Sequence, residues 1–157
     1  MATEEQKKKN LFRMMSMMIA GMAKSLYELF GDTAFATMTE VGKELLEIME
    51  NEMGLEIAGE TPKDVLTEIG RIFADEYGFI ASFKVEGDDH ELRLIVDKCQ
   101  GWNLTQKILK TGVEIPFTCP IMNVGHAALA RMGKSAHRKI EPRPEVRGST
   151  ITFTFEN

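Results

Sequence analysis

Residues 79–97 read FIASFKVEGDDHELRLIVD. Apolar and polar side chains alternate on both sides of the turn sequence Gly87-Asp88-Asp89. A period of two residues is typical of a β-strand with one covered face, and a tight turn between two such runs indicates a hairpin. This stretch therefore predicts two antiparallel strands, one face of which packs on a core.

The half of the chain before this hairpin predicts helices. Large apolar residues recur at steps of three and four in residues 11–29, 35–49 and 65–73. This spacing is that of one helical face. Gly31 ends the first of these stripes, and Thr61-Pro62 starts the third, because a threonine N-cap followed by proline is a strong helix start.

The half after the hairpin predicts further helices and strands. A short helix over residues 104–109 and a helix that begins at Pro120 precede two more strands, residues 136–140 and 148–156. Helices grouped on one side of an antiparallel sheet form the α+β class. We therefore predict N-terminal helices packed on an antiparallel sheet of about four strands, with helices inserted between strands two and three.

Length and composition narrow the functional classes. The 157 residues are 43% hydrophobic and 27% charged, which suits one globular core. We expect residues 1–10 to form a flexible tail and residues 11–157 to form a single domain. The net charge of −5 disfavours a nucleic-acid partner, which would need a basic face.

The apolar run of residues 14–23 is too short to span a bilayer, so no membrane span is expected. Two cysteines make no disulfide framework, and nothing resembles a signal peptide. We expect a cytoplasmic protein whose thiols are reduced.

One stretch reverses the overall charge. Residues 131–147 carry six basic and two acidic side chains, a local charge of +4. Such a stretch is either a solvated strand and turn or a basic rim that attracts an anionic group near a site.

The first predicted helix has an apolar surface wider than one stripe. Met14, Met17 and Ile19 widen the stripe of residues 11–29 beyond a single face. Methionine suits such a surface because its unbranched side chain fills irregular gaps. Three interpretations stay open: a core helix, a helix shared with a second copy of the chain, and the lining of an apolar ligand pocket.

Cys99, Cys119 and His126 form the candidate functional site. Cys119 precedes Pro120 and so takes a helix N-cap, where amide hydrogens and the helix dipole favour a thiolate. A thiolate is a metal ligand, and zinc is the candidate metal for these three residues, with Asp97 as a further ligand. Two helical turns separate Cys119 from His126 by about 10 Å, which makes joint ligation of one ion difficult. Cysteines buried for packing alone are equally consistent with the sequence.

A pocket is the other interpretation of this region. Its predicted ligand-binding residues are Cys99, Trp102, Cys119, His126 and Arg131. An apolar molecule with an acidic head would place that head on the basic stretch. A small enzyme with a nucleophilic Cys119 is the alternative, although the chain has no protease, P-loop or dinucleotide signature.

The order of these motifs resembles the vinyl-4-reductase-type small-molecule-binding domain. The wider fold group of that domain includes ligand-binding domains of nitric-oxide signalling and vesicle-tethering TRAPP subunits. The segments that carry the resemblance are Pro62-Lys63-Asp64-Val65-Leu66, Ile72-Phe73, Tyr77-Gly78-Phe79, Asp97-Lys98-Cys99, Cys119-Pro120 and Gly125-His126-Ala127.

The resemblance implies an α+β domain that dimerises through its N-terminal helices and encloses an apolar pocket. It also implies cysteine-based metal sites in some members, with Cys99 and Cys119 at family cysteine positions. Members often have another cysteine before the last strand, but here Ser149 and Thr150 follow Gly148. That departure favours the pocket over a thiolate metal site.

We therefore expect a homodimeric ligand-binding or sensor-like domain that takes a small apolar molecule and is not an enzyme. The alternatives are a thiol-dependent enzyme that uses Cys119 and a cysteine-ligated, metal-binding regulatory protein.

Overall fold

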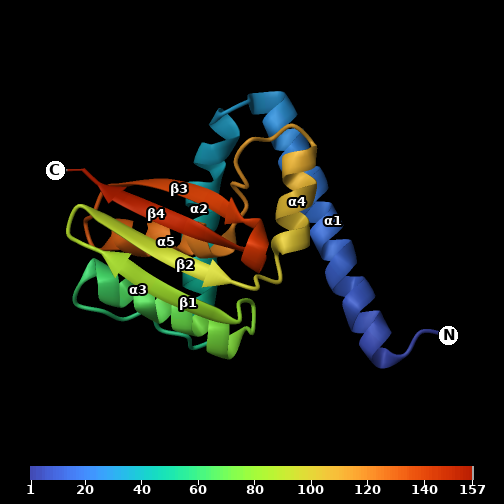
Figure 1. Ribbon diagram of the computed structural model, residues 1–157, viewed down its shortest axis with the longest axis horizontal. Helices are drawn as coiled ribbons and strands as arrows, with labels where there is room; N and C mark the ends of the chain where they lie inside the picture. Colours follow the sequence, from blue (N-terminus) through green and yellow to red (C-terminus); the bar gives the residue numbers. More distant parts are fainter. Residues whose placement is uncertain (157) are drawn as a thin grey trace.

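The computed structural model describes residues 1–156, which form an α+β fold with five α-helices and one four-stranded antiparallel sheet (Figure 1). In chain order the elements are α1 (Glu4–Phe30), α2 (Thr33–Glu47), η1 (Ile48–Glu52), α3 (Pro62–Arg71), η2 (Ile72–Glu76), β1 (Ser82–Gly87), β2 (Glu91–Asp97), α4 (Trp102–Lys110), α5 (Pro120–Arg131), β3 (Ala136–Arg143), η3 (Pro144–Val146) and β4 (Gly148–Phe155). Here η1 and η2 are π-helical extensions of α2 and α3, and η3 is a short 3-10 turn. The predicted fold class is confirmed, including the helices inserted between the second and third strands.

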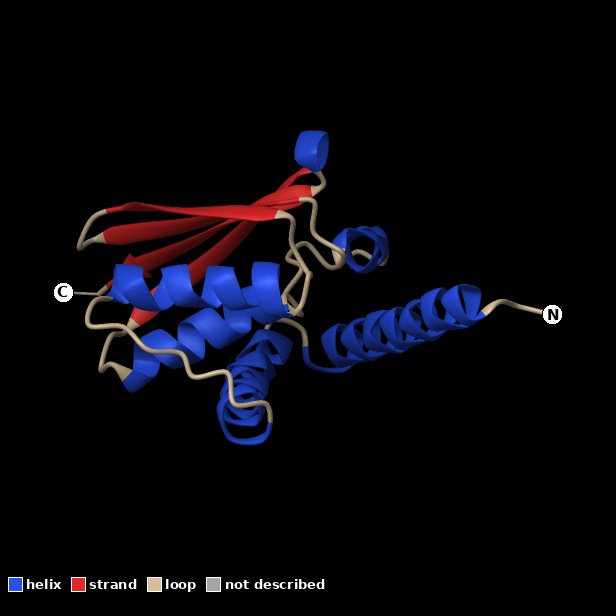
Figure 2. Ribbon diagram, turned by 90° about the horizontal axis from the view of Figure 1, so that it is seen from below, coloured by secondary structure: helices blue, strands red, loops and turns tan. Residues whose placement is uncertain are grey.

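The strands lie in the order β1-β2-β4-β3, and each neighbouring pair is antiparallel. Leu94 of β2 stands opposite Val85 of β1 and Ile151 of β4, so apolar side chains form rows across the sheet. Helices α3 and α5 cover one face, and the opposite face is largely open (Figure 2). The predicted hairpin with one covered face is therefore present.

Local sequence signals account for the helix that supports this face. Thr61 caps α3. Its hydroxyl accepts a hydrogen bond from the amide of Asp64 at 3.2 Å, and the Asp64 carboxylate accepts one from the amide of Thr61 at 3.0 Å. Leu66 and Ile69 of the same helix are fully buried in the core. The capping box and the apolar face together fix where α3 begins and which side it buries.

Close helix packing depends on two glycines. A Cβ at Gly42 of α2 would collide with the carbonyl oxygen of Asn123 in α5, and a Cβ at Gly125 of α5 would lie 2.8 Å from the ring of Phe153 in β4. The absence of a side chain at both positions lets α5 sit between α2 and the sheet.

Helix α1 departs from what the sequence predicts. It begins at Glu4, because Thr3 and Gln6 form a capping box, so residues 4–10 are helical where a flexible tail was expected. Among its 27 residues only Ala20 and Ala23 are buried. The helix packs mainly against α4 and α2 and points away from the sheet (Figures 1 and 2).

Most of the large apolar residues of α1 consequently remain exposed in the single chain. No helix within residues 1–156 combines the length and apolar character that a bilayer crossing requires.

Candidate functional site

A broad groove of about 1240 Å³ lies between the N-terminal half of α1, helix α4 and one end of the sheet. Helix α1 contributes Lys9, Phe12, Arg13 and Ser16 to its wall. Residues 81–82, 97–100 and 145–147 supply the wall at the sheet end, and α4 supplies Asn103, Leu104, Gln106, Lys107 and Lys110.

The groove carries an uncompensated positive charge. Its basic residues are Lys9, Arg13, Lys98, Lys107, Lys110 and Arg147. Its two acidic residues, Asp97 and Glu145, are both bound by Arg143, at 2.8 Å and 3.3 Å. Lys9 pairs with Glu5, whereas the other five basic residues form no ion pair within residues 1–156. Their shared field therefore favours a negatively charged molecule in the groove.

Lys98 and Arg147 hold an unusual backbone at the sheet end of the groove. Their φ angles are 51° and 53°, and within residues 1–156 no other residue except glycine has a positive φ. The amide of Lys98 donates to the carbonyl of Val146 at 3.1 Å, and the amide of Cys99 donates to the carbonyl of Arg147 at 2.9 Å. These paired hydrogen bonds hold two basic residues side by side in a conformation that costs energy.

A second, smaller cavity of about 40 Å³ adjoins the groove. Cys99, Trp102 and Cys119 all line it, together with Phe79 and Pro120 among its apolar walls. Cys99 and Leu104 line both the cavity and the groove, so the two spaces are neighbours at these residues. The volume suits a few water molecules or one small apolar group.

Cys119 is the N-cap of α5, as the sequence predicts, but its thiol does not favour the thiolate. Loss of solvent around the sulfur raises the pKa of Cys119 to about 12 and outweighs the lowering effect of the Met122 and Ile121 amides. Burial also raises the pKa of Cys99. The amides at the start of α5 lower the pKa in the predicted direction, but desolvation has the larger and opposite effect here.

His126 and Arg131 lie outside both cavities. The half-buried imidazole of His126 faces Arg138, and burial, followed by that positive charge, lowers its pKa. Arg131 binds Glu50 at 2.6 Å and the carbonyl of Ile57 at 3.0 Å. The structure thus brings together Cys99, Trp102 and Cys119 and separates the other two predicted residues from them.

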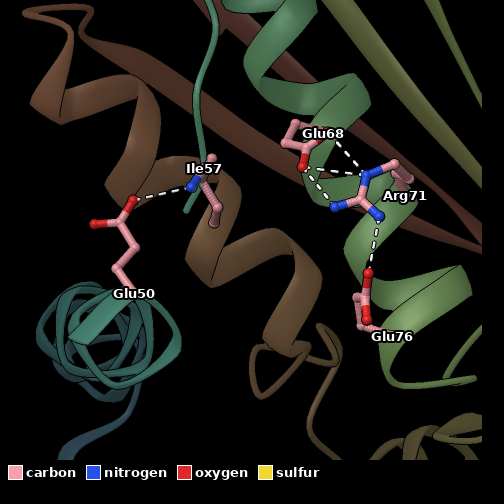
Figure 3. A network of polar contacts seen from close by, with 5 residues as sticks. All are labelled: Glu50, Ile57, Glu68, Arg71 and Glu76. Carbon is pink, nitrogen blue, oxygen red and sulfur yellow. Dashed lines mark hydrogen bonds and ion pairs between the residues drawn. The ribbon is translucent and has the colours of Figure 1, made fainter. Parts of the chain in front are cut away.

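The contact of Arg131 belongs to a structural clamp. Glu50 also accepts a hydrogen bond from the amide of Ile57 at 3.1 Å (Figure 3), so this carboxylate of η1 holds the following loop and α5 together. In a comparable cluster, Arg71 at the end of α3 forms ion pairs with Glu68 of the same helix and with Glu76 at the end of η2 (Figure 3). Every charged side chain of both clusters has an ion-pair partner.

The family described as "Putative rubredoxin C-terminal domain" matches residues 15–155, which is most of the sequence. The chain belongs to this family. The matching family is not the vinyl-4-reductase type, so that resemblance stays a prediction. No curated protein matches the chain.

Two solved structures resemble this member of the rubredoxin C-terminal family. One is the Fe(II) unliganded H-NOX protein from K. algicida, with 13% identity, 84% of this chain and 70% of that chain covered, and a TM-score of 0.48. The other is a mutant of the same H-NOX protein, with 14% identity, the same coverages and a TM-score of 0.46. Both likenesses are too weak to support an inference about function.

The side chains of this rubredoxin C-terminal domain do not fit a rubredoxin-type iron. A tetrahedral iron held by four thiolates needs four cysteines, and the chain has two. Within residues 1–156 no three His, Cys, Asp or Glu side chains are grouped so as to hold a metal. The third ligand of the predicted zinc site, His126, does not line the small cavity that Cys99 and Cys119 share.

The basic residues of the stretch 131–147 do not form a continuous rim around the groove. Arg131, Lys139 and Arg143 have acidic partners, and Arg147 alone reaches the groove. Sequence reasoning missed the groove's main basic residues. A usable signal was present, since residues 98–110 hold three lysines and no acidic residue.

Proposed function

We propose that this rubredoxin C-terminal domain is a ligand-binding, sensor-like domain that holds a small acidic molecule in the groove. The observation that carries the proposal is the set of five basic side chains in one groove that have no ion partner among residues 1–156. A cluster of like charges is unfavourable unless counter-ions or a ligand neutralise it. The strained backbone of Lys98 and Arg147 supports the same assignment, because such strain is concentrated at functional sites.

The geometry suggests an orientation for the ligand. Its acidic group would lie between Lys98 and Arg147, which are held together by the backbone of Cys99 and Val146. An uncharged end would enter the small cavity beyond Cys99, between Trp102 and Cys119. That cavity admits only a short apolar group, so the proposed ligand is a compact acid rather than a long-chain one.

A thiol-dependent enzyme is the less favoured alternative. The raised pKa values of Cys99 and Cys119 keep both sulfurs protonated at neutral pH, and a protonated thiol is a weak nucleophile. The two cysteines serve better as uncharged walls of the small cavity.

We propose in addition that the domain is a homodimer that pairs through α1. Large apolar side chains on this helix are exposed, namely Leu11, Phe12, Met14, Met15, Met17, Met18, Ile19, Met22, Leu29 and Phe30. A patch of this extent on one helix is typical of an interaction surface. Two copies of α1 would be complementary in charge if they packed antiparallel. Residues 4–13 have an excess of basic charge, and the end near Glu28 and Asp32, which would lie opposite them, is acidic.

Ligand binding and dimerisation would then be coupled. Helix α1 contributes one wall of the groove and carries the proposed dimer surface. A ligand that changes how α1 sits on α4 therefore changes the energy of dimerisation, and this coupling is what a sensor requires.

The groove can be tested with inorganic phosphate and butyrate as probes, followed by NMR chemical shifts of the Lys98–Leu104 segment. The double variant Lys98→Met/Arg147→Met is expected to weaken probe binding at least tenfold. The matched control is Lys84→Met/Lys139→Met, since both lysines lie on strands and have acidic partners. Equal binding by the two double variants would refute the groove as an acid-binding site. Native mass spectrometry of the purified protein then shows whether a molecule is retained.

A further inference from the structure

The groove has a helical part, formed by α1 and α4, which pack against each other (Figure 1). On each helix the groove-lining residues are spaced three and four apart, so each helix presents one face to the groove. The two faces comprise Lys9, Phe12, Arg13 and Ser16 on α1 and Asn103, Leu104, Gln106, Lys107 and Lys110 on α4.

A buried cluster sets the position of both faces. Ala20 and Ala23 of α1 share this cluster with Ile108 of α4, which is fully buried. Because Ile108 is anchored there, the rotation of α4 is fixed. The presence of Lys107 and Lys110 at the groove therefore follows from core packing.

The two faces carry four cationic side chains and no carboxylate. Lys9 has an exposed ion pair with Glu5, and none of the other three has an ion-pair partner within residues 1–156. An exposed pair contributes little stability, so a multiply charged anion can replace Glu5. A compact acid at the sheet end would leave these four charges without a partner. A ligand of the helical part therefore needs several negative charges of its own.

The uncharged side chains of the same faces suit a planar, polar ring. Phe12 is 52% exposed, so its ring is accessible for stacking in the groove. The amides of Asn103 and Gln106 both donate and accept hydrogen bonds, as the edge of a nucleobase requires. The groove volume of about 1240 Å³ exceeds the usual range of small-molecule pockets, about 300–1000 Å³, so it has room for a nucleotide beside a compact acid.

We propose that the helical part of the groove binds a nucleoside triphosphate without a magnesium ion. The phosphates lie on the four cationic side chains of α1 and α4, and the base stacks on Phe12. This nucleotide is a second ligand beside the compact acid proposed above. Its site uses neither Lys98 nor Arg147, so either assignment can fail without the other.

The lining also explains why magnesium is left out. Protein sites hold the Mg²⁺ of a nucleotide through one or two carboxylates. The helical part of the groove offers none, and Asp97 and Glu145 at the sheet end are both bound by Arg143. Mg²⁺ would also cancel part of the charge by which the phosphates attract lysine and arginine. Mg²⁺ should therefore weaken binding rather than support it.

Calorimetric titration of the unaltered chain with AMP, ADP and ATP in EDTA tests the proposal. Affinity should rise by about tenfold with each added phosphate, because each one adds charge-assisted hydrogen bonds. Replacement of EDTA by excess Mg²⁺ should lower the affinity for ATP several-fold. Equal affinity for AMP and ATP, or tighter binding of ATP in Mg²⁺, would overturn the proposal.

NMR chemical shifts locate the site without any substitution. ATP should shift the amide signals of residues 9–16 and 103–110, which hold the two helical faces. Shifts confined to residues 97–100 and 145–147 would place ATP in the acid site and overturn the proposal.

The double variant Lys107→Met/Lys110→Met should weaken ATP binding at least about tenfold. The matched control is Lys63→Met/Lys134→Met, which removes the same charge from two lysines outside the groove and should keep the affinity within about twofold. Equal losses in the two double variants would show that ATP responds only to net charge and would overturn the proposal.

The acid-site variant Lys98→Met/Arg147→Met should lose less affinity for ATP than the α4 variant does, because its two residues lie at the sheet end of the groove. A larger loss in the acid-site variant would overturn the proposal.

Phe12→Leu separates the base from the phosphates. Leucine keeps the position apolar but has no ring, so ATP binding should weaken about fivefold or more. Binding of tripolyphosphate, which has no base, should not change. Equal effects on the two ligands would overturn the stacking of a base on Phe12. A single-stranded oligonucleotide that bound the unaltered chain more tightly than ATP would overturn the choice of a free nucleotide.

Discussion

The guanidinium of Arg143 lies 2.8 Å from the carboxylate of Asp97, across the ends of two strands that are not neighbours in the sheet. The same arginine binds Glu145 at 3.3 Å. One residue at the border of the groove thus engages both of the groove's acidic groups. Six basic residues line the groove, and this pairing removes the opposing effect of its two acidic ones, although the chain as a whole has a net charge of −5.

Replacement of Arg143 by methionine should therefore weaken acid binding without removing any residue that lines the groove. Asp97 and Glu145 would be freed, and their charges would offset two of the groove's lysines or arginines. We expect phosphate affinity to fall several-fold and the loss to shrink at high salt, because added ions screen the charges. Stability should change by no more than about 1 kcal/mol, since both partners are partly exposed. Unchanged affinity at low salt would show that the freed acids do not act on the groove.

Substitution at Arg147 should separate stability from binding. Its φ of 53° suits glycine, so Arg147→Gly is expected to keep or raise the free energy of unfolding by up to about 1 kcal/mol. Arg147→Ala keeps the strained backbone and should bring no such gain. Both variants should lose phosphate affinity to the same extent, because both lack the guanidinium. Urea unfolding and phosphate titration of the same samples measure the two effects; a less stable glycine variant would contradict the argument from strain.

The desolvation of the half-buried Cys119 predicts a pH dependence of stability. The pKa of this thiol is about 12 in the folded chain, against an ordinary value of 9.0. Above pH 9 the unfolded chain releases this proton and the folded chain retains it, so the free energy of unfolding falls as the pH rises from 9 toward 12. The loss should reach about 1–2 kcal/mol at pH 10.5 and be absent below pH 8.

The control for this effect is Cys119→Ala, which should show a smaller loss of stability over the same pH range in urea unfolding. Iodoacetamide at pH 7.5 should alkylate the folded protein's Cys119 more slowly than a small free thiol. A rate above that of the free thiol would restore the nucleophilic interpretation.

The dimer proposal predicts a change in oligomeric state when charge is placed on α1. Met15 and Met18 are each about half exposed, at 50% and 54%. The double variant Met15→Glu/Met18→Glu should be monomeric by light scattering at concentrations at which the unaltered chain is a dimer, because burial of two carboxylates opposes association. Ile115→Glu is the control, since Ile115 is 41% exposed in the loop before α5 and lies outside α1. A monomeric unaltered chain would refute the proposed dimer.

Sequence patterns predicted those elements that depend on local chemistry. The alternation around Gly87 predicted the β1–β2 hairpin, and Thr61-Pro62 predicted the start of α3. Cys119 was correctly placed at the N-cap of α5. The start of α1 was missed, although Thr3 and Gln6 form the same kind of capping box, because the charged residues that follow suggested a tail.

The candidate site was predicted only in part, for a reason visible in α5. Cys119 and His126 are two turns apart on one helix, but their side chains have different neighbours. Cys119 lines the small cavity, and His126 faces Arg138. Helical spacing alone limits which residues can meet, but it does not say which neighbouring element each side chain will contact.

What the sequence determined by itself was the class of fold, the order of the elements and the N-cap position of Cys119, because capping and hydrophobic period act over a few residues. Tertiary structure decided the charge of the groove, where Arg143 reaches Asp97 over 46 positions of chain. It also decided the protonation of Cys119, since the desolvation of a thiol depends on every element packed around it. Electrostatic sites are long-range properties, and the tertiary structure alone shows which charges remain unpaired.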